Sequence, residues 1–198
     1  MARTPSNMVK LGTLAPKFTL LNTIDDRLYS SDNLFNKNGT VIMFICNHCP
    51  FVIHLINEIV SISENYKKNI SFVAISSNDV INYPEDSPEL MKKLASDKNF
   101  SFPYLYDETQ EVAKSFDAAC TPDFFLYNDE KKLVYRGQMD DSRPGNGIPV
   151  NGNDLKAALN NLITNKEISN EQKPSIGCNI KWKWLKCYFT IKIYPKQS

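Results

Sequence analysis

Apolar stretches of two different periods alternate along this chain. Unbroken apolar, β-branched runs at 40–45 and 71–76 predict strands buried on both faces, as in the centre of a parallel sheet. Between these runs, apolar residues recur at the spacing of a single helix face: Val52, Leu55, Ile56, Ile59 and Val60. A strand, a helix and a strand in this order predict a right-handed βαβ unit.

The alternation continues as far as residue 166. Ser87 followed by Pro88 is typical of an N-cap and a first helical residue. Beyond that helix we expect a short strand (103–106), a short helix (109–116), two hairpin strands (124–127 and 133–135) and a helix with a stripe that begins at Leu155. This order predicts an α/β sandwich with helices on both faces of a mixed central sheet. The domain spans 10–166, and 167–198 is an extension whose aromatic part, 182–194, is either an added strand or a surface tail.

Composition limits the class of protein. The chain has 198 residues, 42% of them hydrophobic and 23% charged, with a net charge of +1, which describes one globular domain with no electrostatic case for a nucleic-acid partner. The segment Met1–Lys10 is polar and lacks the apolar centre of a secretory signal. No apolar run is long enough to span a bilayer. We therefore expect a cytoplasmic protein without membrane contact.

Two cysteines stand where the first strand gives way to the helix, in the string Cys46-Asn47-His48-Cys49. With Cys46 near the N-cap and Cys49 in the first turn beside Pro50, the two sulfurs lie on one helix face and can meet. Unpaired amides and the helix dipole favour an anion at the first sulfur, with a pKa in the range of roughly 3.5–7.5. The sequence thus predicts a redox dithiol in which Cys46 is the nucleophile and Cys49 resolves the mixed disulfide.

The residues around the sulfurs tune this chemistry. We expect Asn47, His48 and Pro50 to set the redox balance of the pair. A protonated His48 stabilises a neighbouring thiolate and hence the reduced form. The predicted reduction potential therefore lies above about −270 mV, the reducing end of the known dithiol couples.

Five segments of the chain resemble a known family. They are Gly12–Leu20 (Gly-x-x-Ala-Pro-x-Phe-x-Leu), Cys46–Val52, Thr121–Phe125, Tyr135–Asp141 and Ser175–Lys183. Together they resemble the thioredoxin-fold redoxins, specifically the peroxiredoxin-like thiol–disulfide proteins of the alkyl hydroperoxide reductase/thiol-specific antioxidant (AhpC/TSA) superfamily. The resemblance covers roughly 10–183 and implies a thioredoxin-like three-layer sandwich. It also implies a cis peptide before Pro122, a loop that faces the dithiol, and a Thr121 backbone that pairs with an extended substrate.

Three functions stay open at this point. The first is a thiol–disulfide oxidoreductase that exchanges disulfides with a protein or small thiol partner and draws on a separate reductant, with no cofactor and no metal. The second is a thiol-dependent peroxidase that forms a sulfenic acid at Cys46. The third is a non-catalytic metal-binding or interaction module, because Cys46-x2-Cys49-x4-His54 begins like a zinc knuckle but supplies only part of a tetrahedral site.

The other cysteines and one charged segment have weaker assignments. The cysteine count is five, an odd number that favours redox or metal chemistry over a structural disulfide framework in a cytosolic protein. Cys120 and Cys178 are candidates for a third redox thiol, with simple packing as the alternative, and Cys187 has no chemical context. Arg136 and the Asp140–Asp141 pair are expected in a surface turn or along a substrate cleft.

Overall fold

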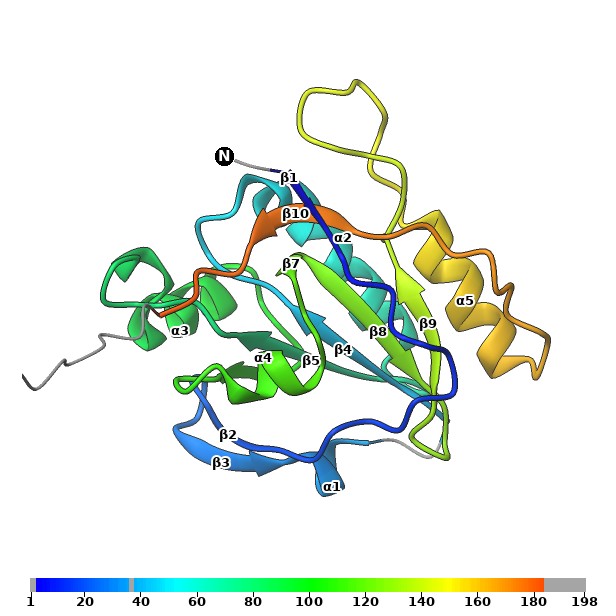
Figure 1. The fold of residues 1–198 in the computed structure, drawn as a ribbon, viewed down its shortest axis with the longest axis horizontal. Helices are drawn as coiled ribbons and strands as arrows, with labels where there is room; N and C mark the ends of the chain where they lie inside the picture. Colours follow the sequence, from blue (N-terminus) through cyan, green and yellow to red (C-terminus); the bar gives the residue numbers. More distant parts are fainter. Residues whose placement is uncertain (1–2, 36–37, 184–198) are drawn as a thin grey trace, which may run out of the picture.

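The computed structural model describes residues 3–35 and 38–183. A seven-stranded mixed sheet forms its centre, in the order β3-β2-β6-β5-β4-β8-β9 (Figure 1). The strands of this sheet are β2 (Thr19–Asn22), β3 (Arg27–Ser30), β4 (Thr40–Phe44), β5 (Ser71–Ser76), β6 (Tyr104–Tyr106), β8 (Asp123–Tyr127) and β9 (Leu133–Gly137). Strands β4, β5 and β6 are parallel, and their outer neighbours are antiparallel. The mixed central sheet expected from the sequence is confirmed.

Helices cover both faces of this sheet. They are α1 (Ser31–Leu34), α2 (Pro50–Tyr66), α3 (Pro88–Asp97), α4 (Glu111–Ser115), α5 (Asn153–Ile163) and the short 3₁₀ helix η1 (Pro84–Asp86). Apolar side chains of α2, α3 and α5 belong to the hydrophobic cluster on one face, and those of α4 belong to the cluster on the other. The predicted N-cap is also present, because the Ser87 side chain accepts a hydrogen bond from the Leu90 amide.

The unit β4–α2–β5 carries the candidate chemistry. All five residues of β4 are buried. Val41 and Met43 pack in the cluster with α2, whereas Ile42 and Phe44 pack in the cluster with α4, as the period of two in a strand requires. Strand β4 pairs in parallel with β5, and α2 lies between the two strands in the sequence. The predicted βαβ unit is therefore confirmed.

A second, three-stranded sheet covers one end of the molecule. It has the order β1-β10-β7 and is built from β1 (Arg3–Pro5), β7 (Cys120–Thr121) and β10 (Ile176–Asn179). In Figure 1, β10 runs across the region where β7 and the start of α2 meet. Sequence periodicity did not predict β1 or β10, because each is too short to show a pattern. The extension after residue 166 thus returns to the domain, and most of its aromatic part lies outside the described residues.

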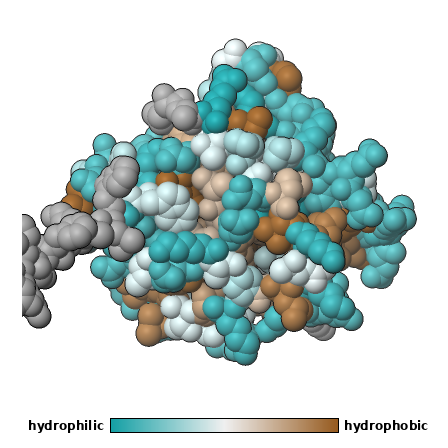
Figure 2. All heavy atoms as spheres, in the orientation of Figure 1, coloured by the Kyte–Doolittle hydropathy of each residue, from teal (hydrophilic) through white to brown (hydrophobic). Residues whose placement is uncertain are grey.

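The surface gives no sign of a membrane span. Within 3–35 and 38–183, no helix combines the length and the apolar character needed to cross a bilayer. The face drawn in Figure 2 is mostly hydrophilic, and its hydrophobic side chains occur in separate small groups.

Candidate active site

The dithiol sits between the end of β4 and the start of α2. Cys46 lies in the connecting segment, and Cys49 is the N-cap of α2, with Pro50 as the first helical residue. This corrects the expected helix start, which placed Cys46 near the cap and Cys49 inside the first turn. Both thiols are reduced, and both are buried, with 1% and 0% of their surface exposed.

Thr121 contacts both sulfurs. Its hydroxyl lies 3.4 Å from the Cys46 Sγ, and its carbonyl oxygen accepts a hydrogen bond from the Cys49 thiol at 3.1 Å. The peptide between Thr121 and Pro122 is cis. The structure therefore brings the four residues together, as the resemblance implied, and the two sulfurs are also hydrogen-bonded to each other.

The two thiols titrate as a pair. Hydrogen-bond contacts with Cys46, Cys178 and the Thr121 side chain outweigh burial and lower the pKa of Cys49 to about 5. Its place at the positive end of α2 acts in the same direction. The hydrogen bond to Cys49, burial and the nearby Asp86 carboxylate raise the pKa of Cys46 well above its ordinary value. The thiolate at Cys46 stays a prediction, although Cys49, and not Cys46, occupies the N-cap that was expected to stabilise it.

A buried carboxylate organises the segment between the two cysteines. Oδ1 of Asp86 accepts hydrogen bonds from the backbone amides of Asn47 (2.7 Å) and His48 (3.3 Å). Oδ2 pairs with Nδ1 of His48 (2.7 Å) and accepts from the Asn78 side chain (2.7 Å). Burial works to raise the pKa of Asp86, but the His48 and Asn78 hydrogen bonds outweigh it, so the net shift is downward. The carboxylate is therefore a fixed negative charge beside Cys46.

His48 is held from two sides. Its ring pairs with Asp86 and stacks on Tyr83, with the ring centroids 5.6 Å apart and the planes only 6° from parallel. The hydrogen bond to Asp86 raises the pKa of His48. Because a carboxylate lies against the imidazolium, little of its positive charge is left to stabilise a Cys46 thiolate. The reduction potential stays a prediction, but the His48 charge no longer supports it by itself.

The second expected tuning residue, Asn47, also has a defined place. Its side chain donates to the Glu85 carbonyl oxygen at 2.9 Å and accepts from the Tyr104 hydroxyl at 3.1 Å. The connecting segment is thus tied to η1 and to β6. The two residues between the sulfurs are fixed by hydrogen bonds of both backbone and side chain.

Sequence reasoning missed the 78–86 segment. Asp86 lies almost forty positions from the dithiol, in a polar stretch without periodicity, and Asn78 and Tyr83 share that stretch. A buried carboxylate cannot be recognised from one sequence. The only local signal was the pair of prolines that brackets Asp86, which marks a turn.

A metal would find a different ligand set from the one the sequence suggested. Ligand atoms of Cys46, His48 and Asp86 lie within 4.8 Å of one another, although Nδ1 of His48 is already paired with the carboxylate. His54, expected as the zinc-knuckle ligand, instead makes a 2.7 Å hydrogen bond from its Nε2 to the Ser142 hydroxyl. The geometry thus does not assemble the predicted Cys–Cys–His arrangement.

The remaining cysteines fall into different groups. Cys178 in β10 is buried and in side-chain hydrogen-bond contact with Cys49. Cys120 is also buried, but its thiol points to the Pro122 carbonyl oxygen at 3.7 Å, and burial raises its pKa. Cys187 lies outside the described residues. Arg136, expected at the surface or in a cleft, is instead completely buried in β9, because its guanidinium pairs with Asp123.

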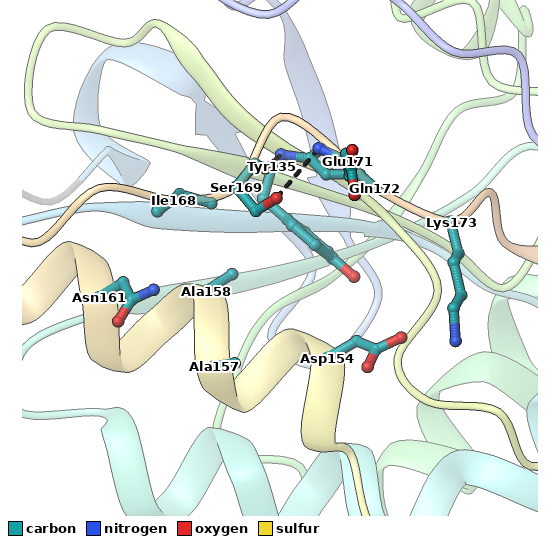
Figure 3. Close-up of a pocket in the computed structure, with 10 residues that line it drawn as sticks. All are labelled: Tyr135, Asp154, Ala157, Ala158, Asn161, Ile168, Ser169, Glu171, Gln172 and Lys173. Carbon is teal, nitrogen blue, oxygen red and sulfur yellow. Dashed lines mark hydrogen bonds between the residues drawn. The ribbon is translucent and has the colours of Figure 1, made fainter.

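Two pockets differ in their relation to the dithiol. A groove of about 460 Å³ opens beside the His48 ring; it is lined by Asp79, Asn82, Tyr83, Asn179, Lys181, Trp182 and Lys183. A pocket of about 230 Å³ lies between α5 and the 168–173 segment (Figure 3). Tyr135 and Asp154 point into it, and a hydrogen bond from Gln172 to the Ser169 carbonyl closes one wall. No cysteine or histidine lines that pocket, so we assign it no redox role.

The fold and these thiols define a class, a thioredoxin-like α/β protein with a dithiol at the start of a helix. The chain belongs to the AhpC/TSA family, whose family model matches residues 11–136. Membership of this family indicates a redox enzyme of the oxidoreductase or peroxidase kind. No curated protein matches the chain.

Solved structures agree with this fold. A crystal structure of an uncharacterized conserved protein from Geobacillus kaustophilus is 56% identical, with a TM-score of 0.91, and the match covers 92% of this chain and 97% of that one. A hypothetical protein from Sinorhizobium meliloti 1021 is 42% identical, with a TM-score of 0.89 and coverage of 91% and 98%. A thiol:disulfide interchange protein of the thioredoxin family from Chlorobium tepidum TLS is 15% identical, with a TM-score of 0.58 and coverage of 79% and 99%. This last likeness concerns the fold alone.

Proposed function

We propose that this protein is a thiol–disulfide oxidoreductase that works through Cys46 and Cys49. The observation that supports this most directly is the pair of free, buried thiols in hydrogen-bond contact with each other, in which the pKa of Cys49 is lowered to about 5. A thiolate is the attacking species in disulfide exchange. The partner is a disulfide-containing or thiol protein or a small thiol, and a separate reductant restores the dithiol.

We assign the first attack to Cys49, because its pKa is the lowered one of the pair. The Cys49 thiolate attacks one sulfur of the partner disulfide, which forms a mixed disulfide and releases the other sulfur as a thiolate. Cys46 then loses its proton and attacks the Cys49 Sγ. This step forms the Cys46–Cys49 disulfide and releases the second partner sulfur, while the proton from Cys46 neutralises the partner thiolate. The order is opposite to the one predicted from the sequence.

Ionisation of Cys46 is timed by the same contacts. In the reduced protein, the hydrogen bond to Cys49 and the charge of Cys49 both raise the pKa of Cys46, together with burial and Asp86. When Cys49 enters a mixed disulfide, it loses its negative charge and its hydrogen bond with the Cys46 thiol. Two of the causes that hold the Cys46 proton then disappear. The resolving thiol therefore becomes easier to ionise at the step that uses it.

A partner reaches the sulfurs only after local movement, since neither is exposed by more than 1%. The groove beside His48 is lined by Lys181 and by Tyr83, whose ring stacks on His48. We propose that a partner approaches through this groove. The Thr121 backbone, expected to pair with an extended substrate, pairs instead with β10 of the same chain.

Trapping of mixed disulfides tests both the function and the roles. We would combine Cys178→Ser with either Cys46→Ser or Cys49→Ser, so that no third thiol can release a partner. Because the proposal gives the first attack to Cys49, Cys46→Ser/Cys178→Ser should retain a covalently bound disulfide peptide, seen as a mass increase. Retention by Cys49→Ser/Cys178→Ser alone would restore the opposite order of attack. If neither variant retains the peptide and the parent protein does not reduce insulin disulfides, the proposed function is wrong.

The peroxidase alternative is separated in the same experiment. Hydrogen peroxide consumption and insulin reduction are measured on the same preparation with the same reductant. The proposal predicts that insulin reduction is the faster reaction at equal substrate concentration. Fast peroxide consumption with a sulfenic acid detectable in Cys49→Ser would favour the peroxidase.

A further inference from the structure

Strand β10 of the same chain places the Cys178 thiol beside the dithiol. Strand β10 pairs antiparallel with β7, which places Cys178 directly opposite Thr121. Thr121 is the residue that contacts both sulfurs of the dithiol. Cys178 is buried and in hydrogen-bond contact with Cys49. Cys49 is therefore in hydrogen-bond contact with both Cys46 and Cys178.

The seat of β10 is closely fitted. A Cβ atom on Gly177 would lie 2.0 Å from the Thr121 carbonyl oxygen and 2.6 Å from its carbonyl carbon, distances that no side chain can adopt. Only glycine lets the strand come this near. The chain after the strand is also held, since the Lys181 amide donates to Asn78 at 2.8 Å and the Asp79 amide donates to the Lys181 carbonyl at 2.8 Å.

We infer that Cys178 is a third redox thiol that takes over the disulfide from Cys46 and Cys49, an inference that rests on the proposed function. Cys178 gives up its proton and attacks the Cys49 Sγ of the Cys46–Cys49 disulfide. The Cys49–Cys178 bond forms, the Cys46–Cys49 bond breaks, and Cys46 leaves as a thiolate that takes up a proton. No electrons enter or leave, so the protein stays oxidised by two electrons. The oxidising equivalents come from the partner disulfide.

The contacts of Cys178 favour this transfer at the right moment. In the reduced protein, burial together with the hydrogen bond and the charge of Cys49 raises the pKa of Cys178 to about 12. Formation of the Cys46–Cys49 disulfide removes the charge of Cys49. Burial remains, and Lys181 acts in the opposite direction. Cys178 therefore becomes a better nucleophile when its target disulfide has been made.

The product has a consequence for partner exchange. A Cys49–Cys178 disulfide ties β10 covalently to the start of α2 and keeps the Thr121 backbone occupied. Cys46 is at the same time returned to the thiol state. The oxidised protein thus has two forms. One contains the Cys46–Cys49 disulfide, and the other contains the Cys49–Cys178 disulfide, which fixes β10 to the start of α2.

Disulfide mapping tests the inference in variants that all carry Cys187→Ser, so that Cys187 cannot interfere. Each protein is equilibrated in an oxidising glutathione buffer, alkylated, digested with trypsin and analysed by mass spectrometry. No Lys or Arg separates Cys46 from Cys49, whereas many separate Cys49 from Cys178. The first disulfide therefore stays within one peptide, and the second joins two peptides.

In Cys46→Ser, the joined Cys49–Cys178 peptides should be the main oxidised product. Adding Gly177→Ala should lower their yield several-fold, because β10 is pushed away from Thr121. Adding Cys120→Ser, a neighbouring buried thiol that points elsewhere, should leave the yield unchanged. Glutathione attached to Cys49 with Cys178 fully alkylated would overturn the inference.

The second measurement uses a protein in which Cys46, Cys49 and Cys178 are all unmutated. The Cys187→Ser protein alone should contain both disulfides at intermediate glutathione ratios, which avoids any folding defect of the other variants. If it forms only the Cys46–Cys49 disulfide and still reduces insulin, the inference fails while the proposed function stands. If it forms both disulfides but exchanges no disulfide with insulin, the proposed function fails.

Discussion

Two buried carboxylates near the dithiol have opposite tendencies to ionise. Asp86 and Asp123 both have 0% of their surface exposed. Four hydrogen bonds reach the two oxygens of Asp86, and its pKa is lowered. Asp123 pairs with a buried arginine, yet burial raises its pKa to about 7. Asp86 also pairs with the cationic His48, so a cationic partner alone does not decide whether a buried carboxylate stays ionised here.

The difference lies in how the donors are shared. Oδ2 of Asp123 meets the Arg136 Nη2 at 3.1 Å and the Ala119 amide at 3.5 Å, and Oδ1 has no hydrogen-bond partner among the described residues. Arg136 divides its donors between this carboxylate and the carbonyl oxygens of Phe116 and Asp117. A buried charge without enough donors is expensive, so it favours the neutral form. Asp86 thus supplies a constant charge, whereas Asp123 changes its charge near neutral pH.

The largest effect should come from removing the Asp86 carboxylate. Asp86→Ala leaves two half-buried amides, the His48 ring and the Asn78 side chain without their acceptor. We expect a loss of about 3–5 kcal/mol in the free energy of unfolding, measured in urea under reducing conditions. Glu85→Ala, one residue earlier and exposed, is the matched control and should stay within about 0.5 kcal/mol of the parent. Similar free energies of unfolding for the two variants would show that Asp86 does not stabilise the fold.

The second effect is a pH dependence that belongs to Asp123. Its pKa is higher in the folded than in the unfolded protein, so the folded state binds the extra proton. The resulting stability is fully present below pH ~4 and is lost as the pH rises to about 7, an amount of up to about 4 kcal/mol at about 1.4 kcal/mol per pKa unit. Urea unfolding of the parent and Asp123→Asn across this range measures it. The variant should lack this decline, and parallel curves would contradict the assignment.

A smaller effect is expected on the titration of the thiols. Asp86→Asn keeps the shape of the side chain and removes the charge that raises the pKa of Cys46. Because the two thiols titrate as a pair, the second of the two observed pKa values should fall by about one unit. Thiolate absorbance against pH measures both steps. An unchanged second step would show that the carboxylate does not act on Cys46.

The smallest effect should come from His48. Its pKa is raised by the hydrogen bond to Asp86, so near neutral pH its positive charge partly offsets that carboxylate. His48→Gln should therefore raise the pKa of the second thiol step, by less than about one unit. His54→Gln is the control, because His54 lies within α2 and its ring is hydrogen-bonded to Ser142. Equal titration curves for the two variants would leave His48 without influence on the thiols.

What the sequence revealed depends on how local each feature is. The buried runs of β4 and β5 and the stripe of α2 were readable because each is set by neighbouring residues. The proximity of Thr121 and Pro122 to the dithiol followed from the family resemblance, not from any pattern of periodicity. The start of α2 was misjudged, because a shift of a few residues moves the N-cap from one cysteine to the other.

The features that the sequence concealed are contacts between distant segments. Asp86 is joined to Asn47 across 39 positions, and nothing near either residue announces the contact. The role of Gly177 appears only when Thr121 is placed against it. The same holds for Cys178, because only the fold shows that it is a neighbour of Cys49.

Because the dithiol is completely enclosed, its reaction rates depend on how often its surroundings open. A reagent in solution meets these sulfurs only during brief excursions in which the covering strand or the adjoining loop detaches. When reclosing is faster than chemical attack, the observed rate is the intrinsic rate multiplied by the fraction of time spent detached. The reactivity of this pair is then governed as much by the looseness of its covering as by the acidity of its thiols.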